Sequence, residues 1–200
     1  NGYHPTIIEA DAKVGGRVQS DEVNGFVLDR GFQVLLSAYP AAQHYLDFNK
    51  LNLQKLLPGA TIFKNGKQQT IGDPLRNLGL LFPTLFSSIG SVADKFKILK
   101  LNSLLKKKKI SEIFEEKEKS TLNYLKDFGF SDAIINNFFT PFFSGIFLEP
   151  NLATSSRMFK FVYKMFGNGL AVIPKNGIQA ISNQLKENLK HTEFIFNSPV

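Results

Sequence analysis

An apolar strand that ends in an acidic residue, followed shortly by two glycines and an arginine, constrains this chain most. Residues Tyr3–Glu9 (YHPTIIE) carry β-branched side chains and end in a carboxylate, which predicts a buried strand of a parallel sheet. In a βαβ unit that binds a dinucleotide, the second strand ends in Asp or Glu, whose carboxylate accepts a hydrogen bond from a ribose hydroxyl. Glu9 fits that position, so the first strand and the glycine-rich turn of such a unit are expected before residue 1.

The segment after this strand has the composition of a phosphate-binding loop. Gly15 and Gly16 let the backbone approach a ligand closely, and Arg17 presents a planar fork of N–H donors. A phosphate is the ligand that suits this combination. Two plainer interpretations stay open: Glu9 as an ordinary carboxylate at a strand end, and Arg17 as a surface arginine.

Turn and helix signals divide the rest of the chain. Two Asn-Gly dipeptides, at residues 24–25 and 65–66, predict tight hairpins within residues 18–29 and 60–71, and Pro40 opens a helix. After the second hairpin the spacing of the apolar residues becomes helical. The predicted helices in this part are Leu75–Ile89, Val92–Leu105, Ser120–Phe128, Ser131–Phe139 and Thr154–Phe166.

The last part of the chain returns to an alternation of helix and strand. Residues Ile178–Leu189 have amphipathic spacing, and Glu193–Phe196 is a short strand pattern. The charged run Lys106–Lys119 is interpreted as a solvated linker or a frayed helix end. The predicted fold class is therefore α/β, with a mainly helical insertion that carries a small β-hairpin. Its predicted parts are residues 1–50, the insertion 51–167, and residues 168–200.

Composition excludes several classes of function. The chain has no cysteine, so disulfide scaffolds, thiolate metal sites and cysteine nucleophiles are ruled out. His4, His44 and His191 lie far apart without acidic partners at ligand spacing, so no metal is predicted. The net charge of +7 would suit a phosphate-rich ligand, a nucleic acid or an anionic membrane surface. The basic run lacks interleaved aromatic residues, so no nucleic acid partner is predicted.

The run IIEADAKVGGRV, a short hairpin and then DRGFQ resemble the N-terminal flavin-binding region of one superfamily of FAD-dependent enzymes. This superfamily contains the amine oxidases, protoporphyrinogen oxidases and phytoene desaturases. The later segments GFSDAIINNFFTPFFSGIFL, TSSRMFKFV and GNGLAVIPKNGIQAISNQL are also similar to it. The resemblance implies FAD as cofactor, a partial Rossmann-like FAD-binding domain and an inserted substrate domain. It also implies that the GxGxxG segment and a C-terminal part of the enzyme lie outside these residues.

The resemblance carries roles onto individual residues. Glu9 would bind the adenosine ribose, Arg17 the pyrophosphate, and the backbone of Val200 the adenine. Phe32 stands where many relatives have a glycine or a small residue, and Asp11 stands where several amine oxidases have an arginine that touches the ribose. The complete set of predicted FAD contacts is Glu9, Ala10, Gly15, Gly16, Arg17, Gly31, Phe32, Gln33 and Val200, of which Gly31, Phe32 and Gln33 would lie near the isoalloxazine ring.

The predicted function is that of an oxidase, desaturase or isomerase in which flavin accepts a hydride equivalent from an apolar or amine-bearing organic substrate. No catalytic side chain is assigned. A phenylalanine cluster either lines an apolar substrate cavity or is plain core. Its members are Phe138, Phe139, Phe142, Phe143 and Phe147.

Two other functions are weighed against this one. The first is a non-catalytic escort or binding protein of the same fold. The second is a basic domain that contacts a membrane surface through Lys106–Lys109. No run of apolar residues reaches the roughly 18 that span a bilayer, and no secretory signal is recognisable. An intracellular, cytoplasmic protein is predicted, with peripheral membrane contact as an open alternative.

Overall fold

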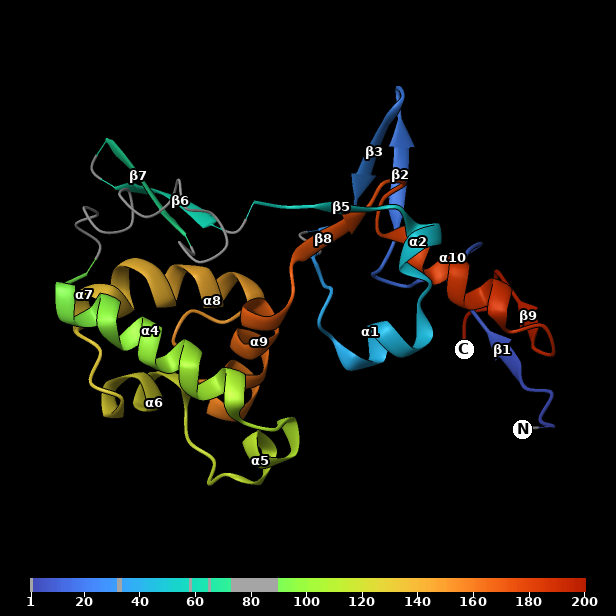
Figure 1. The fold of residues 1–200 in the computed structure, drawn as a ribbon. Helices are drawn as coiled ribbons and strands as arrows, with labels where there is room; N and C mark the ends of the chain where they lie inside the picture. Colours follow the sequence, from blue (N-terminus) through green and yellow to red (C-terminus); the bar gives the residue numbers. More distant parts are fainter. Residues whose placement is uncertain (1, 32–33, 58, 65, 73–89) are drawn as a thin grey trace. The chain divides into compact units, whose positions relative to one another are not determined.

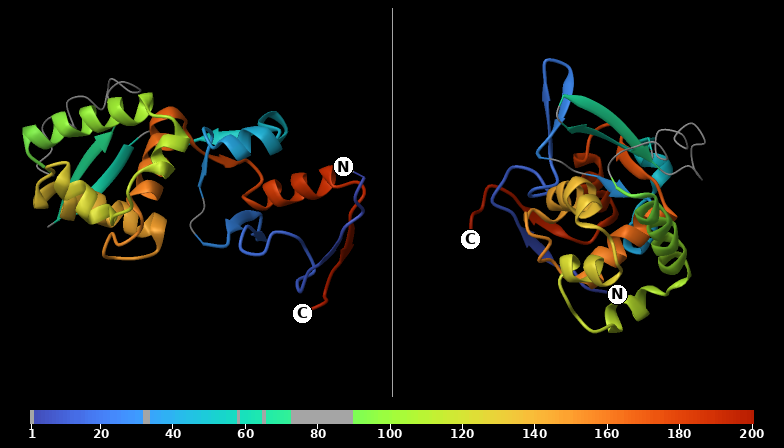
Figure 2. Two further views of the ribbon diagram at one scale, coloured as in Figure 1. Left: turned by 90° about the horizontal axis from the view of Figure 1, so that it is seen from below. Right: turned by 90° about the vertical axis from the view of Figure 1, so that its left-hand side faces the viewer.

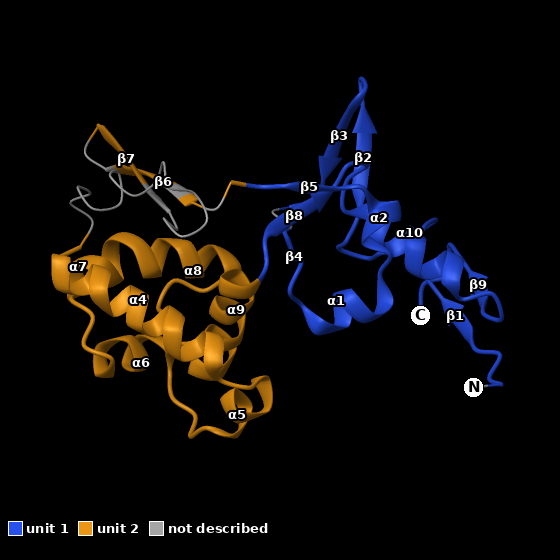
Figure 3. Cartoon of the chain, in the orientation of Figure 1, with its two compact units in different colours: residues 1–56, 169–200 blue, residues 57–168 orange. Residues whose placement is uncertain are grey.

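The computed structural model describes residues 2–31, 34–57, 59–64, 66–72 and 90–200. The chain forms two compact units (Figure 3): unit 1 comprises Asn1–Leu56 with Gly169–Val200, and unit 2 comprises Leu57–Asn168. The sequence placed residues 51–56 in the insertion, but they belong to unit 1. The reason is a pairing that is distant in sequence, between strands Leu53–Lys55 and Ala171–Pro174.

The described residues of unit 1 form three small sheets, whose strands can be followed in Figure 1. Strand β1 (Thr6–Ile8) pairs in parallel with β9 (Glu193–Ile195). Strands β2 (Ser20–Val23) and β3 (Phe26–Asp29) form a hairpin. A third, antiparallel sheet has the order β4-β8-β5, formed by Leu35–Leu36, Ala171–Pro174 and Leu53–Lys55.

Two features of these strands had been predicted, with different outcomes. The β2–β3 hairpin is confirmed, because Asn24 (φ 53°) and Gly25 (φ 81°) both adopt the left-handed backbone that a type I′ turn needs. The prediction of a buried strand in residues 3–9 is wrong in its burial. Ile7 and Ile8 are 38% and 53% exposed, since β9 is the one strand that pairs with β1 in the described part of the chain.

The helices in the described part of unit 1 are α1 (Pro40–Tyr45), α2 (Phe48–Leu51) and α10 (Gln179–Asn188). Pro40 lies in the first turn of α1, where its missing N–H costs no hydrogen bond. A small core of Leu35, Ala42 and Val172 joins the antiparallel sheet to α1. The helices and sheets of unit 1 can be followed in two further views (Figure 2).

Unit 2 is mainly helical and also holds the predicted second hairpin, β6 (Gly59–Lys64) and β7 (Lys67–Gly72). Helix α9 contacts α4, α5 and α6. None of the described helices is long and apolar enough to cross a membrane. The helices are α4 (Val92–Lys107), α5 (Ile110–Glu115), α6 (Thr121–Asp127), α7 (Asp132–Ile134), the π-helix η2 (Ile135–Phe139), α8 (Thr140–Phe147) and α9 (Ser156–Asn168).

The run Lys106–Lys119 of unit 2 is more ordered than the sequence predicts. The run Lys106–Lys119 was expected to be a linker or a frayed end, but it contains helix α5, whose Ile113 is fully buried. The apolar side chains of α5 anchor it to α9 despite the lysines around it. The predicted helix Leu75–Ile89 lies outside the described residues.

A buried carboxylate ties two helix N-termini of unit 2 together. The Oδ2 atom of Asp94 in α4 accepts hydrogen bonds from the N–H (2.9 Å) and hydroxyl (2.7 Å) of Ser91. Ser131, which caps α7, donates its N–H (3.0 Å) and its hydroxyl (2.7 Å) to the same carboxylate. Burial alone would raise the pKa of Asp94, but these hydrogen bonds outweigh it and lower the pKa from its ordinary 3.8 to about 2.

Because the folded-state pKa is lowered, Asp94 stabilises the fold above pH 4, and this contribution is lost as the pH falls from about 4 through 2. We expect Asp94→Asn, which keeps the shape but not the charge, to destabilise unit 2 by about 2 kcal/mol at pH 7. About half of that difference should disappear at pH 3. Amide hydrogen exchange of α4 and α7, measured at both pH values, checks this; a difference that does not change with pH would contradict it.

Candidate functional site

The carboxyl ends of β1 and β9 meet at one edge of their parallel pair, and Glu9 lies there. The Glu9 N–H donates to the Ile195 carbonyl (2.9 Å), and the Ser198 N–H donates to the Glu9 carbonyl (3.0 Å). The half-buried Glu9 side chain accepts a hydrogen bond at Oε1 from the Asp11 N–H (2.9 Å). Its Oε2 makes no hydrogen bond with any residue that the structure describes. This geometry fixes the carboxylate and leaves one oxygen able to accept from a ligand.

The loop from Val14 to Val18 follows, and its two glycines serve different purposes. Gly15 (φ 121°) has no room for a side chain, since a Cβ would lie 2.5 Å from the Val18 carbonyl oxygen. The Val18 N–H donates to the Gly15 carbonyl (2.7 Å) and closes the turn. Gly16 (φ 53°) has nothing within 4 Å of its Cβ position and is exposed. Gly15 therefore shapes the loop from inside, and Gly16 presents open backbone to the solvent.

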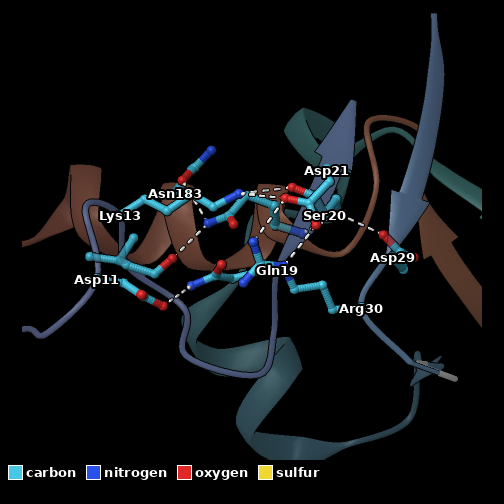
Figure 4. A network of polar contacts seen from close by, with 10 residues as sticks. Asp11, Lys13, Gln19, Ser20, Asp21, Asp29, Arg30 and Asn183 are labelled. Carbon is cyan, nitrogen blue, oxygen red and sulfur yellow. Dashed lines mark hydrogen bonds and ion pairs between the residues drawn. The ribbon is translucent and has the colours of Figure 1, made fainter. Parts of the chain in front are cut away.

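A polar network connects Lys13, directly before this loop, to the β2–β3 hairpin (Figure 4). The Lys13 ammonium donates to the Ser20 carbonyl (2.9 Å), and its Nζ lies 3.4 Å from a carboxylate oxygen of Asp21. Arg30 donates twice to the Asp21 carboxylate, at 2.8 and 3.0 Å, and lowers the pKa of that carboxyl. The backbone N–H of Arg30 also donates to the backbone carbonyl of the buried Gln19 (2.9 Å). The end of β3, which leads into Gly31, is thereby held beside the chain that leaves the loop.

The same hairpin holds the first turn of α10. The Asp29 carboxylate accepts from the Ile178 N–H (2.9 Å), and the Ser20 hydroxyl oxygen accepts from the Gln179 N–H (3.1 Å). The Ser20 hydroxyl in turn donates to Asp29 (2.6 Å). Gly177 (φ 79°) permits this contact, because a Cβ there would lie 2.4 Å from the Ser20 hydroxyl oxygen. Loop, hairpin and helix are thus hydrogen-bonded into one assembly.

The structure describes seven of the nine predicted FAD contacts. Phe32 and Gln33 lie outside the described residues. Backbone hydrogen bonds bring Glu9 beside the segment that leads to Val200. The seven residues are the half-buried Glu9 and Gly15, and the exposed Ala10, Gly16, Arg17, Gly31 and Val200.

Sequence reasoning missed the polar residues that support the loop from α10 and the hairpin. These are Ser20, Asp29, Gln179 and Ser182. The Asn176-Gly177 dipeptide before α10 is the local signal that could have drawn attention to a tight backbone approach there. Among the described residues, no group of three or more acidic or histidine side chains could hold a metal ion.

Comparison with known proteins defines the class. A family model described as flavin containing amine oxidoreductase matches residues 1–200, so the chain belongs to that family. FAD is the cofactor of this family, and its members are oxidoreductases. The family membership confirms the resemblance that the sequence motifs indicated.

Individual relatives point the same way. The chain is 28% identical over 148 residues to protoporphyrinogen oxidase 2, chloroplastic/mitochondrial, of Arabidopsis thaliana. The aligned region covers 72% of this chain and 28% of that protein. A crystal structure of a putative protoporphyrinogen oxidase from Exiguobacterium sp. 255-15 matches with a TM-score of 0.59 at 19% identity, over 98% of this chain and 47% of that one. The structure of a triple mutant of putrescine oxidase, redesigned in cofactor binding, also matches with a TM-score of 0.59. The identity is 16%, and the match covers 98% of this chain and 45% of that one. The chain thus spans less than half the length of these relatives.

The residues present fit the adenosine and phosphate part of FAD. Glu9 offers a fixed carboxylate with one oxygen that no described residue binds. At Gly16 (φ 53°) the space that a side chain would fill is open. A backbone with left-handed glycines can approach phosphate oxygens without a steric clash.

Proposed function

We propose that the full-length protein is an FAD-dependent oxidoreductase of the oxidase, desaturase or isomerase type. Unit 1 binds the cofactor, and unit 2 binds an apolar or amine-bearing organic substrate. The observation that supports this most directly is Glu9 at the carboxyl edge of two parallel strands, where dinucleotides bind in open α/β sheets. When bound, the flavin supplies the redox chemistry by accepting a hydride equivalent.

The residues of this chain bind and orient the cofactor. The Glu9 carboxylate accepts hydrogen bonds from the ribose hydroxyls, with its angle set by the Asp11 N–H. Arg17 donates to the pyrophosphate, and the open backbone of Gly16 allows close approach. Gly31, Phe32, Gln33 and Val200 are proposed as the remaining contacts, together with Ala10.

Within unit 2, the three half-buried phenylalanines Phe138, Phe142 and Phe147 are the proposed substrate contacts. Phe138 and Phe142 stack with ring centroids 5.7 Å apart. Partly exposed aromatic rings favour an apolar substrate. Adding polyenes, porphyrinogens and amines to the full-length protein while following flavin bleaching tests this; bleaching by small polar amines alone would exclude an apolar substrate.

Removing the Glu9 carboxylate should weaken FAD binding. For Glu9→Ala we expect the Kd for FAD to rise by about tenfold to a hundredfold, since hydrogen bonds to a charged group contribute about 1.5–3 kcal/mol. Titration of the apoprotein with FAD, followed by flavin fluorescence, measures this. Glu22→Ala is the matched control, because Glu22 is an exposed acid on β2. Equal affinities for Glu9→Ala and the wild type would contradict the ribose role.

Other functions make different predictions for the same preparation. A full-length protein without flavin absorbance would favour the escort protein. Peripheral membrane contact through Lys106–Lys109 would appear as binding to anionic vesicles. Lys108 in this run is paired with Glu116 and is partly buried, which leaves fewer basic groups for a lipid surface. Residence in the cytoplasm stays a prediction.

A further inference from the structure

We propose that helix α10 positions the loop Val14–Val18 for the cofactor through Gln179 and Ser182. This inference rests on the proposed function, since the loop is the proposed phosphate contact. It assigns a role to two side chains that do not themselves touch FAD.

The two side chains hold the two ends of the loop. The Gln179 amide donates through Nε2 to the Val14 carbonyl (2.8 Å). One turn later, the Ser182 hydroxyl donates to the Val18 carbonyl (3.1 Å). Residues three apart lie on the same face of a helix, so one face of α10 is hydrogen-bonded to both ends of the loop. Of the three residues between them, Gly16 and Arg17 are exposed, whereas Gly15 faces Ser182 and leaves no room for a side chain.

The helix itself is fixed, so that it can act as a rigid support. Its first N–H groups donate to Asp29 and Ser20 of the hairpin. Gln179 is 9% exposed and also donates to Asn183 (3.2 Å), which restricts its rotamer. A loop bound at both ends to such a helix loses little conformational freedom when it takes up a ligand, which raises affinity.

If Gln179 and Ser182 had only a structural role, they would stabilise α10 without affecting how the loop binds a ligand. Gln184 separates the two cases, because it lies on the same helix, is 8% exposed, and binds elsewhere. Its side chain accepts from the Asp47 N–H (2.9 Å) and donates to the Asp47 carbonyl (3.0 Å). The substitution Gln→Glu removes the N–H donor at either position while it preserves the shape of the side chain.

The test uses the full-length apoprotein, titrated with FAD. ADP, which carries the pyrophosphate without the flavin ring, serves as a competitor. For Ser182→Ala and Gln179→Glu we expect the Kd for FAD to rise about tenfold, which corresponds to about 1.4 kcal/mol, and ADP to compete less well by a similar factor. For Gln184→Glu we expect the Kd to stay within about twofold of the wild type, although its melting temperature falls.

Three results would overturn the proposal. If Gln184→Glu loses as much FAD affinity as Gln179→Glu, the effect is one of general stability. If the wild type binds FAD and both loop variants bind it equally well, α10 does not position the loop, although the proposed function stands. If the wild type binds no FAD, the proposed function fails, and the positioning role fails with it.

Discussion

Replacing Phe143 by alanine is expected to destabilise unit 2 by about 3–5 kcal/mol. Phe143 is 1% exposed. Its ring packs edge-to-face against that of Phe159, with 4.8 Å between the ring centroids. It also contacts the rings of Phe139 and Tyr163. Deleting the ring opens a cavity that these neighbours fill only in part. Loss of amide protection in α8 and α9 of the full-length protein measures the effect.

The adjacent Phe142 provides the control. It is half-buried and packs against Phe138 and Phe166, so Phe142→Ala should cost about half as much stability. If Phe142 contacts substrate, its variant should raise KM for an apolar substrate while the protection of α9 is kept. Equal destabilisation by the two alanine variants would show that the cluster is a single core and would remove Phe142 from the proposed substrate contacts.

The sequence left open whether these phenylalanines line an apolar cavity or pack as plain core. Residues Phe138–Phe147 are apolar except for Thr140 and Ser144, and periodicity alone does not give the burial of each ring. In the structure, Phe139 and Phe143 face the core, while Phe138, Phe142 and Phe147 are half-buried. The π-helix Ile135–Phe139 shifts the helical period just before α8, which a regular 3.6-residue pattern does not anticipate.

The elements predicted correctly are those specified by neighbouring residues. Asn24-Gly25 forms the turn between two strands that are adjacent in sequence, and Pro40 begins α1. The missed strands depend on distant partners. β4 has only two residues and β8 only four, and their pairing joins Leu35 to Val172 across most of the sequence. The sequences of β4 and β8 carry too little pattern for this pairing to be predicted locally.

The same distinction applies to the candidate site. Glu9 and the glycine pair could be selected from the sequence because the strand, the acid and the loop are contiguous. Gln179 and Ser182 could not, since their contacts with Val14 and Val18 span 165 and 164 positions. The support of a binding loop is a tertiary property, although the residues that face the ligand form a local motif.

Replacing Glu116 by alanine is expected to destabilise unit 2 by about 3 kcal/mol. The ammonium of Lys160 is paired with Glu116, and the Lys160 side chain is only 2% exposed. Burial raises the pKa of Glu116, but hydrogen bonds from Lys108 and Lys160 lower it overall. Without Glu116, Lys160 keeps a buried charge whose remaining partner among the described residues is the ring of Tyr124, with 4.7 Å between Nζ and the ring centroid. Amide exchange of α6 and α9 reports the loss.

Two further variants show whether the unpaired charge is the cause. Glu116→Ala combined with Lys160→Met removes both charges, so stability should return to within about 1 kcal/mol of the wild type. Lys108→Met removes the outer partner, which is 34% exposed, and should cost at most about 1 kcal/mol. If the double variant is as unstable as Glu116→Ala alone, packing around Glu116 carries the stability. Recovery in the double variant would instead show that the buried Lys160 of α9 needs a carboxylate partner. Helix α5 supplies that partner, because it ends at Glu115 and Glu116 is its C-cap residue.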